Sequence, residues 1–175
     1  NTAFQNGQVG IFAFSSTVSG NTTYQNGGAG IQADGSISGN TVHQNGGVGI
    51  NASLSTVSGN MVYRNKSDGI IASGVLSDNT AFLNGGVGIS SSFSTISNNT
   101  VYSNGGSGIF ATNGSSVRGN TVRQNTGFGL ELFLQVTYRD NTITNNTAGT
   151  VTGLDLVNKG DNYCAGTGTS SADCP

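Results

Sequence analysis

The sequence predicts an all-β fold, a single-stranded parallel β-helix of about eight coils, and three observations predict it. A motif of the form Asn-Thr-x-aromatic-x-Asn-Gly-Gly-x-Gly-Ile recurs along the 175 residues, beginning at residues 1, 21, 40, 60, 79, 99, 120 and 141. Its apolar positions alternate with polar ones at period two, which is the pattern of a strand. No helical pattern interrupts the repeats of 19–21 residues, so each copy is expected to form one coil that stacks on the next.

Each coil is expected to contain three short strands, with the sequences Thr-Val-Tyr, Gly-Ile-x-Ala and Thr-Val-Ser. Turns rich in Asn and Gly separate these segments. In the third coil, Val42, Ile50, Ala52 and Val57 are the apolar residues that would face inward. Stacked coils then form three parallel sheets around a narrow core, and eight coils at ~4.8 Å each give a rod about 38 Å long.

Asn occupies two positions of every copy, and we interpret both columns as structural rather than catalytic. Asn tolerates left-handed backbone geometry at a corner, and its amide can bond to the identical amide one coil above. A Gly precedes the Ile in most copies, as Gly49 precedes Ile50, and we expect it to form a second bend of the coil. The first column comprises Asn1, Asn21, Asn40, Asn60, Asn79, Asn99, Asn120 and Asn141. The second column, the predicted ladder, comprises Asn6, Asn26, Asn45, Asn65, Asn84, Asn104, Asn125 and Asn146.

The repeat weakens after residue 130 and ends near residue 151. We therefore divide the chain into β-helix repeats over 1–151 and a C-terminal cap or tail over 152–175. Cys164 and Cys174 are expected to form a disulfide worth about 2–3 kcal/mol in the chain-entropy model, the alternative being two free thiols in a cytosolic tail. A disulfide, together with few Lys and much Ser and Thr, favours an extracellular or cell-surface protein.

The composition disfavours several partners. Six Lys and Arg against eight Asp and Glu give a formal net charge of −2, so nothing attracts nucleic acid or an anionic membrane. No apolar run approaches the ~20 residues of a membrane span. The chain starts inside a repeat with no Met and no signal peptide, as expected of a mature fragment or of a chain whose upstream segment is absent.

The Asn-Thr-Val-x-x-Asn-Gly-Gly-x-Gly-Ile copies resemble right-handed parallel β-helix repeat proteins, the pectate-lyase-like superfamily, and the resemblance covers the whole chain. The ending, with Gly-Asp-Asn-Tyr-Cys at 160–164 and Cys-Pro at 174–175, is similar to the tail of secreted bacterial β-helix proteins of unassigned function. The resemblance implies a right-handed coil. It does not specify an activity, because the matching residues are those that build the coil.

Pectate lyases, polygalacturonases and alginate epimerases on this fold use clustered carboxylates, often with Ca²⁺, His or a basic residue. Here Asp34, Asp68 and Glu131 occupy different positions of the repeat, so no pair suited to glycoside hydrolysis is expected. No group of carboxylates suits Ca²⁺ either. The single histidine, His43, has no carboxylate or nucleophile beside it. We therefore predict no catalytic residue, no metal and no cofactor, which disfavours an enzyme.

Two outward rows are candidate binding surfaces. Flat rings occupy the fourth position of six successive coils, namely Phe4, Tyr24, His43, Tyr63, Phe82 and Tyr102. These rings either stack on one another and set the register, which we favour, or form a stripe that binds sugar rings or a partner. Hydroxyls such as those of Thr56 and Ser58 form the second row, which is similar to the faces of ice-binding β-solenoids. The alternative is an ordinary solvated strand face.

The sequence therefore predicts a non-catalytic, extracellular, structural β-solenoid. Its uncapped first coil could stack head to tail on another copy and so build filaments or surface assemblies. The alternative is a binding module, for polysaccharide through the aromatic rings or for ice through the hydroxyl row. A polysaccharide lyase or hydrolase is the least favoured reading.

Overall fold

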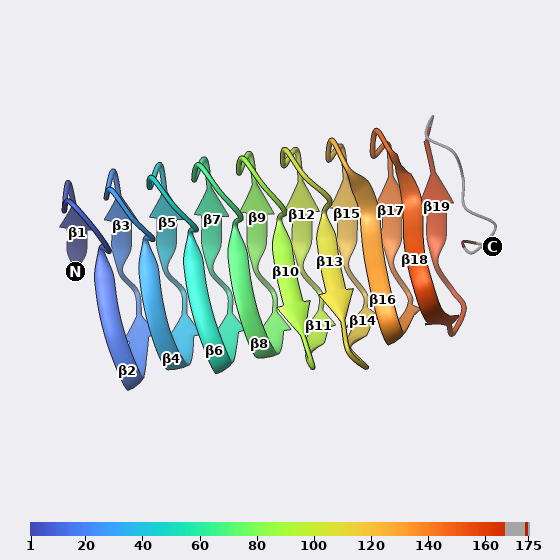
Figure 1. The fold of residues 1–175 in the computed structure, drawn as a ribbon, viewed down its shortest axis with the longest axis horizontal. Coiled ribbons are helices and arrows are strands. Elements are labelled where there is room, and N and C mark those ends of the chain that lie inside the picture. Colours follow the sequence, from blue (N-terminus) through green and yellow to red (C-terminus); the bar gives the residue numbers. More distant parts are fainter. Residues whose placement is uncertain (167–173, 175) are drawn as a thin grey trace.

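The computed structural model, which describes residues 1–166 and 174, is a straight rod of stacked coils (Figure 1). We number the coils 1 to 9 from the Asn that begins each of them: Asn1, Asn21, Asn40, Asn60, Asn79, Asn99, Asn120, Asn141 and Asn162. Each coil contributes one strand of three residues to a first, nine-stranded sheet. Its strands are β1 (Thr2–Phe4), β3 (Thr22–Tyr24), β5 (Thr41–His43), β7 (Met61–Tyr63), β9 (Thr80–Phe82), β12 (Thr100–Tyr102), β15 (Thr121–Arg123), β17 (Thr142–Thr144) and β19 (Tyr163–Ala165).

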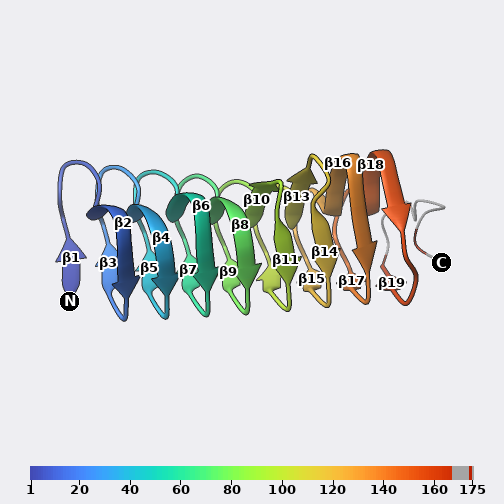
Figure 2. The same cartoon turned by 90° about the horizontal axis from the view of Figure 1, so that it is seen from below.

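The second sheet contains the other two predicted segments of each coil. In most coils these segments run on as one bent strand, and register shifts such as that between Ala52 and Ser55 mark the bend. Coils 5 and 6 keep them as separate strands (Figure 2). The strands are β2 (Ile11–Ser19), β4 (Ile31–Ser38), β6 (Ile50–Ser58), β8 (Ile70–Ser77), β10 (Ile89–Ser92), β11 (Thr95–Ser97), β13 (Ile109–Thr112), β14 (Ser116–Arg118), β16 (Phe128–Arg139) and β18 (Gly149–Asn158).

Every strand pairing is parallel, and equivalent residues of successive coils lie opposite one another. Ile31 pairs with Ile50, and Ile50 pairs with Ile70. These side chains, together with Val42 and Val62 from the first sheet, are 0% exposed and fill the narrow interior. The described residues form no helix. The predicted fold class is therefore confirmed, but the rod has two sheets where we expected three, because two of the three predicted segments run on as one strand in most coils.

The left-handed residues of the coil are not the ones that we expected. Each buried column Asn directly follows a residue with positive φ, as Asn21 follows Gly20 and Asn26 follows Gln25. The residues before the first column have φ of 56–64°, and those before the second have φ of 54–57°. Gly, Asp and Asn fill the first of these positions because they tolerate this region. The expectation that the column Asn itself turns the corner is wrong.

The recurrent Gly serves close packing rather than a bend. Neither Gly30 nor Gly49 has a positive φ. A Cβ added at Gly30 would collide with Val42 of the next coil and lie 2.7 Å from Asn45 Nδ2. A Cβ added at Gly49 would lie 2.8 Å from Asn65 Nδ2. Glycine is needed here because the next coil occupies the space of a side chain.

Parallel pairing continues beyond residue 151, where we expected the repeats to stop. β18 pairs with β16 as far as Asn158, and β19 pairs with β17 so that Cys164 lies opposite Ile143. The predicted disulfide between Cys164 and Cys174 is present. The division into domains at residue 151 stays a prediction. Within residues 1–166, no helix is long and apolar enough to cross a membrane.

Candidate functional site

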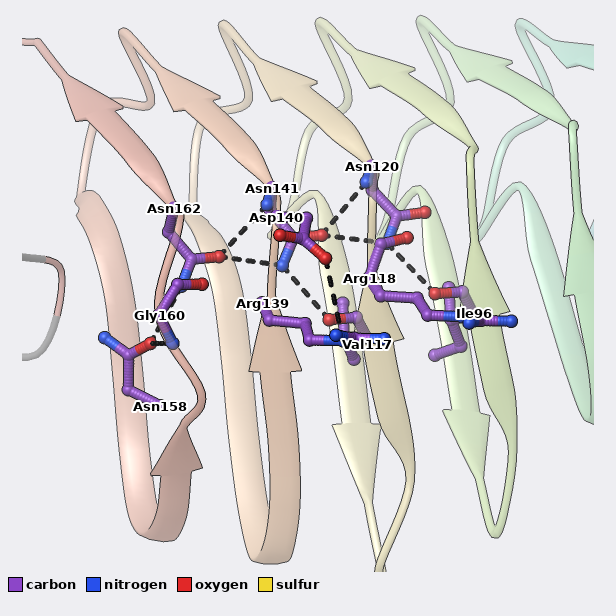
Figure 3. Close-up of polar contacts among 10 residues, drawn as sticks. All are labelled: Ile96, Val117, Arg118, Asn120, Arg139, Asp140, Asn141, Asn158, Gly160 and Asn162. Carbon is purple, nitrogen blue, oxygen red and sulfur yellow. Dashed lines mark hydrogen bonds and ion pairs between the residues drawn. The ribbon is translucent and has the colours of Figure 1, made fainter.

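The two Asn columns are hydrogen-bonded ladders, as predicted. Asn45 donates from its backbone N and from Nδ2 to Asn65 Oδ1, at 3.1 and 3.0 Å, and its Nδ2 also reaches Thr23 O at 3.3 Å. Figure 3 shows the other ladder at its far end, where Asn141 donates in the same way to Asn162 Oδ1. From coil 2 onward these amides are buried and bond to one another inside the rod, so they hold adjacent coils together.

The aromatic residues form one continuous stack along the first sheet. From Phe4 to Tyr102, the ring centroids of neighbouring coils lie 4.8–5.2 Å apart and the ring planes differ by 2–10°. Arg123 continues the column, with its guanidinium carbon 4.5 Å from the centroid of Tyr102. The faces of the inner rings cover one another, and only their edges are open. This geometry supports the stacking interpretation, and a binding role for Phe4, Tyr24, His43, Tyr63, Phe82 and Tyr102 stays a prediction.

Most of the acidic residues have local structural roles. Asp78, Asp140 and Asp161 are the left-handed residues before ladder Asn, with φ of 56–58°. Asp68 Oδ1 accepts a hydrogen bond of 2.8 Å from Val87 N. Glu131 Oε2 accepts one of 2.7 Å from the Ser107 hydroxyl. These carboxylates bond to neighbouring groups of the coil rather than to one another.

Two of the basic residues near coil 7 have partners within the chain. Arg123 lies on Tyr102, and Arg139 pairs with its neighbour Asp140 through an Nε–Oδ2 distance of 3.6 Å (Figure 3). That ion pair is about half exposed and contributes little to stability. Across the described part of the chain, no three His, Cys, Asp or Glu side chains lie close enough together to hold a metal ion. His43, the single histidine, lies in the aromatic stack, and its Nδ1 is 3.0 Å from Gln44 Oε1.

A shallow groove of about 250 Å³ lies on the outward face of the second sheet. It crosses β6, β8, β10 and β13, which pair side by side, so the groove follows the long axis of the rod. Ile71 and Phe110 are its large apolar side chains, and Ala52 and Ala72 line it as well. Amide and hydroxyl groups surround them. The polar side chains that line the groove are Asn51, Ser53, Ser73, Ser90, Ser91, Ser92 and Thr112.

A row of exposed apolar side chains lies beside this groove, at the bend of the second sheet. It comprises Leu54, Phe93 and Leu134, which are 90%, 76% and 56% exposed, and we call it the corner row. All three have a positive φ, of 48°, 52° and 64°. Gly35 of coil 2 and Gly74 of coil 4 make the same bend on either side of Leu54. Asn113 of coil 6 lies at the bend between Phe93 and Leu134. The corner row is therefore interrupted in alternate coils.

Two open notches separate or flank the members of the corner row. The first has a volume of about 330 Å³, and the second of about 370 Å³. Asp34 lines the first notch and Asp155 lines the second. The first notch is formed by Ser15, Asp34, Gly35, Ser53 and Leu54. The second is formed by Phe93, Asn113, Gly114, Leu134, Gln135 and Asp155.

Sequence reasoning missed the corner row, although the repeat carries a signal for it. Leu54 and Phe93 each lie between two serines, in coils that are one residue longer than the coils with Gly35 and Gly74. The serine that follows closes the bulge, because Ser55 Oγ donates to Ser53 O at 2.7 Å and accepts from Gly35 N at 3.2 Å. The extra residue is the one that projects into solvent.

The hydroxyl row of the bent strands lies on the outside, as the alternation predicts. Thr17 and Thr56 are exposed, and Ser58 is half-buried. Val75 interrupts the row with 43% of its surface exposed. An apolar side chain in the middle weakens the likeness to a regular ice-binding face. Ice binding stays a prediction.

Comparison with known proteins relates the whole solenoid to solved structures. The periplasmic alginate epimerase AlgG superposes with a TM-score of 0.60 at 16% identity, covering 83% of this chain and 50% of that one. The A-module of the mannuronan C-5 epimerase AlgE6 of Azotobacter vinelandii superposes with a TM-score of 0.56 at 19% identity, covering 97% and 54%. The Dettilon tailspike protein gives 0.57 at 15% identity, covering 89% and 46%. The chain spans about half the length of these proteins.

Sequence comparison gives the family. A search of curated protein sequences finds no match. The family model described as the right-handed β-helix region matches residues 1–148 of the 175. The match covers coils 1 to 7 and the start of coil 8, with the two ladders and the stacked core. This chain therefore belongs to the right-handed β-helix family.

Proposed function

We propose that this chain is a non-catalytic β-helix that binds polysaccharide, and that the polymer lies along the outward face of the second sheet. The observation that carries the proposal is the groove over β6, β8, β10 and β13. It is open along its length and follows the rod axis, so it suits a linear polymer rather than an enclosed small molecule.

The lining of the groove matches the chemistry of a sugar chain. A pyranose ring has C–H faces and a rim of hydroxyls, so it needs apolar contacts flanked by hydrogen-bonding groups. Ile71 and Phe110 supply the apolar contacts, and Asn51, Ser90 and Thr112 supply donors and acceptors around them. The structural neighbours AlgG and AlgE6 are epimerases of alginate and mannuronan, which are polysaccharides, and this supports the proposal.

Binding without reaction is the form of the proposal that the lining favours. Glycoside hydrolysis needs two carboxyl groups on either side of the bond that is cleaved. The groove is lined by Asn, Ser, Thr, Ala, Ile and Phe, with no titratable side chain among the described lining residues. The disulfide between Cys164 and Cys174 favours a location outside the cytoplasm, in line with the periplasmic neighbour AlgG.

Affinity electrophoresis through gels that contain soluble polysaccharides tests the proposal. Ile71→Ser and Phe110→Ser should each weaken retention about tenfold, because each removes apolar contact worth about 1.5–3 kcal/mol when fully buried. Val75→Ser is the matched control, since Val75 is an exposed apolar residue of β8 outside the groove. The proposal is rejected if no gel retains the protein. It is also rejected if the groove variants are retained as strongly as the wild type. New reducing ends or unsaturated products would reject its non-catalytic part.

A second candidate is a structural rod that associates end to end, and this too is a proposal. It is supported by the outer edges of β1 and β2, which pair with no strand among the described residues. Unpaired strand edges offer backbone groups to another chain. Sedimentation velocity at several concentrations should show a mass that rises with concentration. A single monomeric species throughout would exclude end-to-end association.

A further inference from the structure

The corner row is unfavourable for folding in its backbone conformation and in the exposure of its side chains. The left-handed region disfavours bulky side chains, yet Leu54, Phe93 and Leu134 have φ of 48–64°. Their side chains are also 56–90% exposed, so burial gives little in return. Gly35 and Gly74 make the same bend without either disadvantage. Folding therefore does not account for the three apolar side chains.

The three members of the corner row are two coils apart, and Leu154 of coil 8, 72% exposed, follows Leu134 in the adjacent coil. Leu54 lies in coil 3, Phe93 in coil 5 and Leu134 in coil 7, and the strand register places the residues before them in one column. Adjacent coils are ~4.8 Å apart, so successive members of the row are separated by ~9.6 Å along the rod. One notch lies between Phe93 and Leu134, and the other lies on the N-terminal side of Leu54. The corner thus combines three exposed apolar side chains with two open notches.

The notches carry negative charge that has no partner cation. Asp34 lines the notch beside Leu54, and Asp155 lines the notch between Phe93 and Leu134. Neither carboxylate forms an ion pair with any described residue. A polymer with regularly spaced carboxylates would be repelled here, whereas hydroxyl or ammonium groups would find acceptors.

The spacing favours a glycan over a peptide. Side chains on one face of an extended peptide repeat every two residues, or ~6.8 Å, and a helix repeats every turn of ~5.4 Å. Neither matches a spacing of ~9.6 Å, whereas a polysaccharide with a repeat of two sugars has a repeat of this order. Sugar C–H faces would pack on the exposed apolar side chains while hydroxyl or amino groups enter the notches.

We infer that the corner row and its notches bind an extended glycan with a two-sugar repeat that is uncharged or carries amino groups, and that they discriminate against polyuronates. This inference rests on the proposed function, because the same polymer would contact the adjacent groove. Ser53 lines both the groove and the notch beside Leu54, so the two surfaces are continuous. It names a ligand class that differs from the alginate and mannuronan of the structural neighbours.

The test is affinity electrophoresis in three sets of gels: an uncharged 1,4-linked glucan or mannan, partly deacetylated chitin, and alginate or polygalacturonate. The triple variant Leu54→Ser, Phe93→Ser and Leu134→Ser should lose at least tenfold in retention by the first two sets. Leu83→Ser is the matched control, because Leu83 is also left-handed and 45% exposed but lies at a different corner. Far-ultraviolet circular dichroism and thermal melting would show that both variants remain folded.

Charge variants test the discrimination. Asp34→Asn combined with Asp155→Asn should weaken retention by deacetylated chitin several-fold, reduce its salt dependence, and increase retention by alginate. The inference is overturned if polyuronates bind best and the corner variants have no effect. If the groove variants still weaken binding in that case, the proposed function stands; if no gel retains the protein, both fail. A wild-type oligomer that the triple variant converts to a monomer would make the corner row a protein interface and would also overturn the inference.

Discussion

At the scale of single residues, the buried hydroxyls of Thr23 and Thr150 have no hydrogen-bond partner among the described residues, and Thr23 is the one that lies opposite a Val of the next coil. Thr23 is fully buried in the column that holds Val42 and Val62, and its hydroxyl has no hydrogen-bond partner. A buried hydroxyl without a partner costs about 1–3 kcal/mol. The adjacent coils show that a Val fits this position with the same backbone.

We therefore expect Thr23→Val to raise the free energy of unfolding by about 1–2 kcal/mol. Urea denaturation followed by circular dichroism measures the change. Thr22→Val is the control, because Thr22 is half-buried on the outward side of the same strand and should shift stability little. A less stable Thr23→Val protein would mean that the hydroxyl makes an interaction that the structure does not show.

The residues that build the coil were predictable one column at a time, but their conformations were not. A repeated Ile or Asn indicates a buried column because only one environment explains every copy. A left-handed backbone position is not identified by one residue type, since Gln25, Arg64 and Leu83 all adopt it at the same turn of the coil. Residues at this position are exposed, so many side chains are tolerated there and the residue type varies from coil to coil.

At the scale of the element, the aromatic stack is the feature for which the sequence left two interpretations open. Tyr63 lies between His43 and Phe82, with centroid distances of 4.8 and 4.9 Å. Stacked pairs contribute about 0.5–1.5 kcal/mol each beyond the area that they bury. Tyr63→Ala should therefore destabilise the protein by about 2–3 kcal/mol, and Phe4→Ala, at the end of the stack, by less.

Glycan retention separates the two interpretations. With the ring faces covered, Tyr63→Ala and Tyr102→Ala should leave retention unchanged once the folded fraction is corrected for. Chemical denaturation and affinity electrophoresis on the same preparations give both quantities. A loss of retention without a loss of stability would instead make the aromatic column a binding stripe.

The strands were predicted, whereas the bend within them was not. Alternation at period two identifies the buried faces of Gly-Ile-x-Ala and Thr-Val-Ser but does not show that they form one strand. Coil length does not decide it either, because coils 3 and 5 both have 20 residues, yet coil 3 has the single strand β6 and coil 5 has the separate strands β10 and β11. A bulge such as the one at Ser55 marks the bend. The corner row follows from that bulge, which is why the alternation did not reveal it.

At the scale of the whole molecule, each coil contacts only the coils beside it, so stability is passed along the rod from neighbour to neighbour. Coil 9 has one such neighbour among the described residues. Its strand β19 contains Cys164, which lies opposite Ile143 and is partly buried against the core. The disulfide to Cys174 restrains the chain at this end.

We expect the double variant Cys164→Ser with Cys174→Ser to lower the stability of this end by about 2–3 kcal/mol, because a loop of about ten residues is no longer closed. Hydrogen exchange should show faster exchange in β17, β18 and β19 and unchanged protection in β6 and β8. That contrast follows from coupling between adjacent coils alone. An equal loss of protection in all coils would show instead that the rod unfolds as one cooperative unit and that its far end controls the stability of the groove.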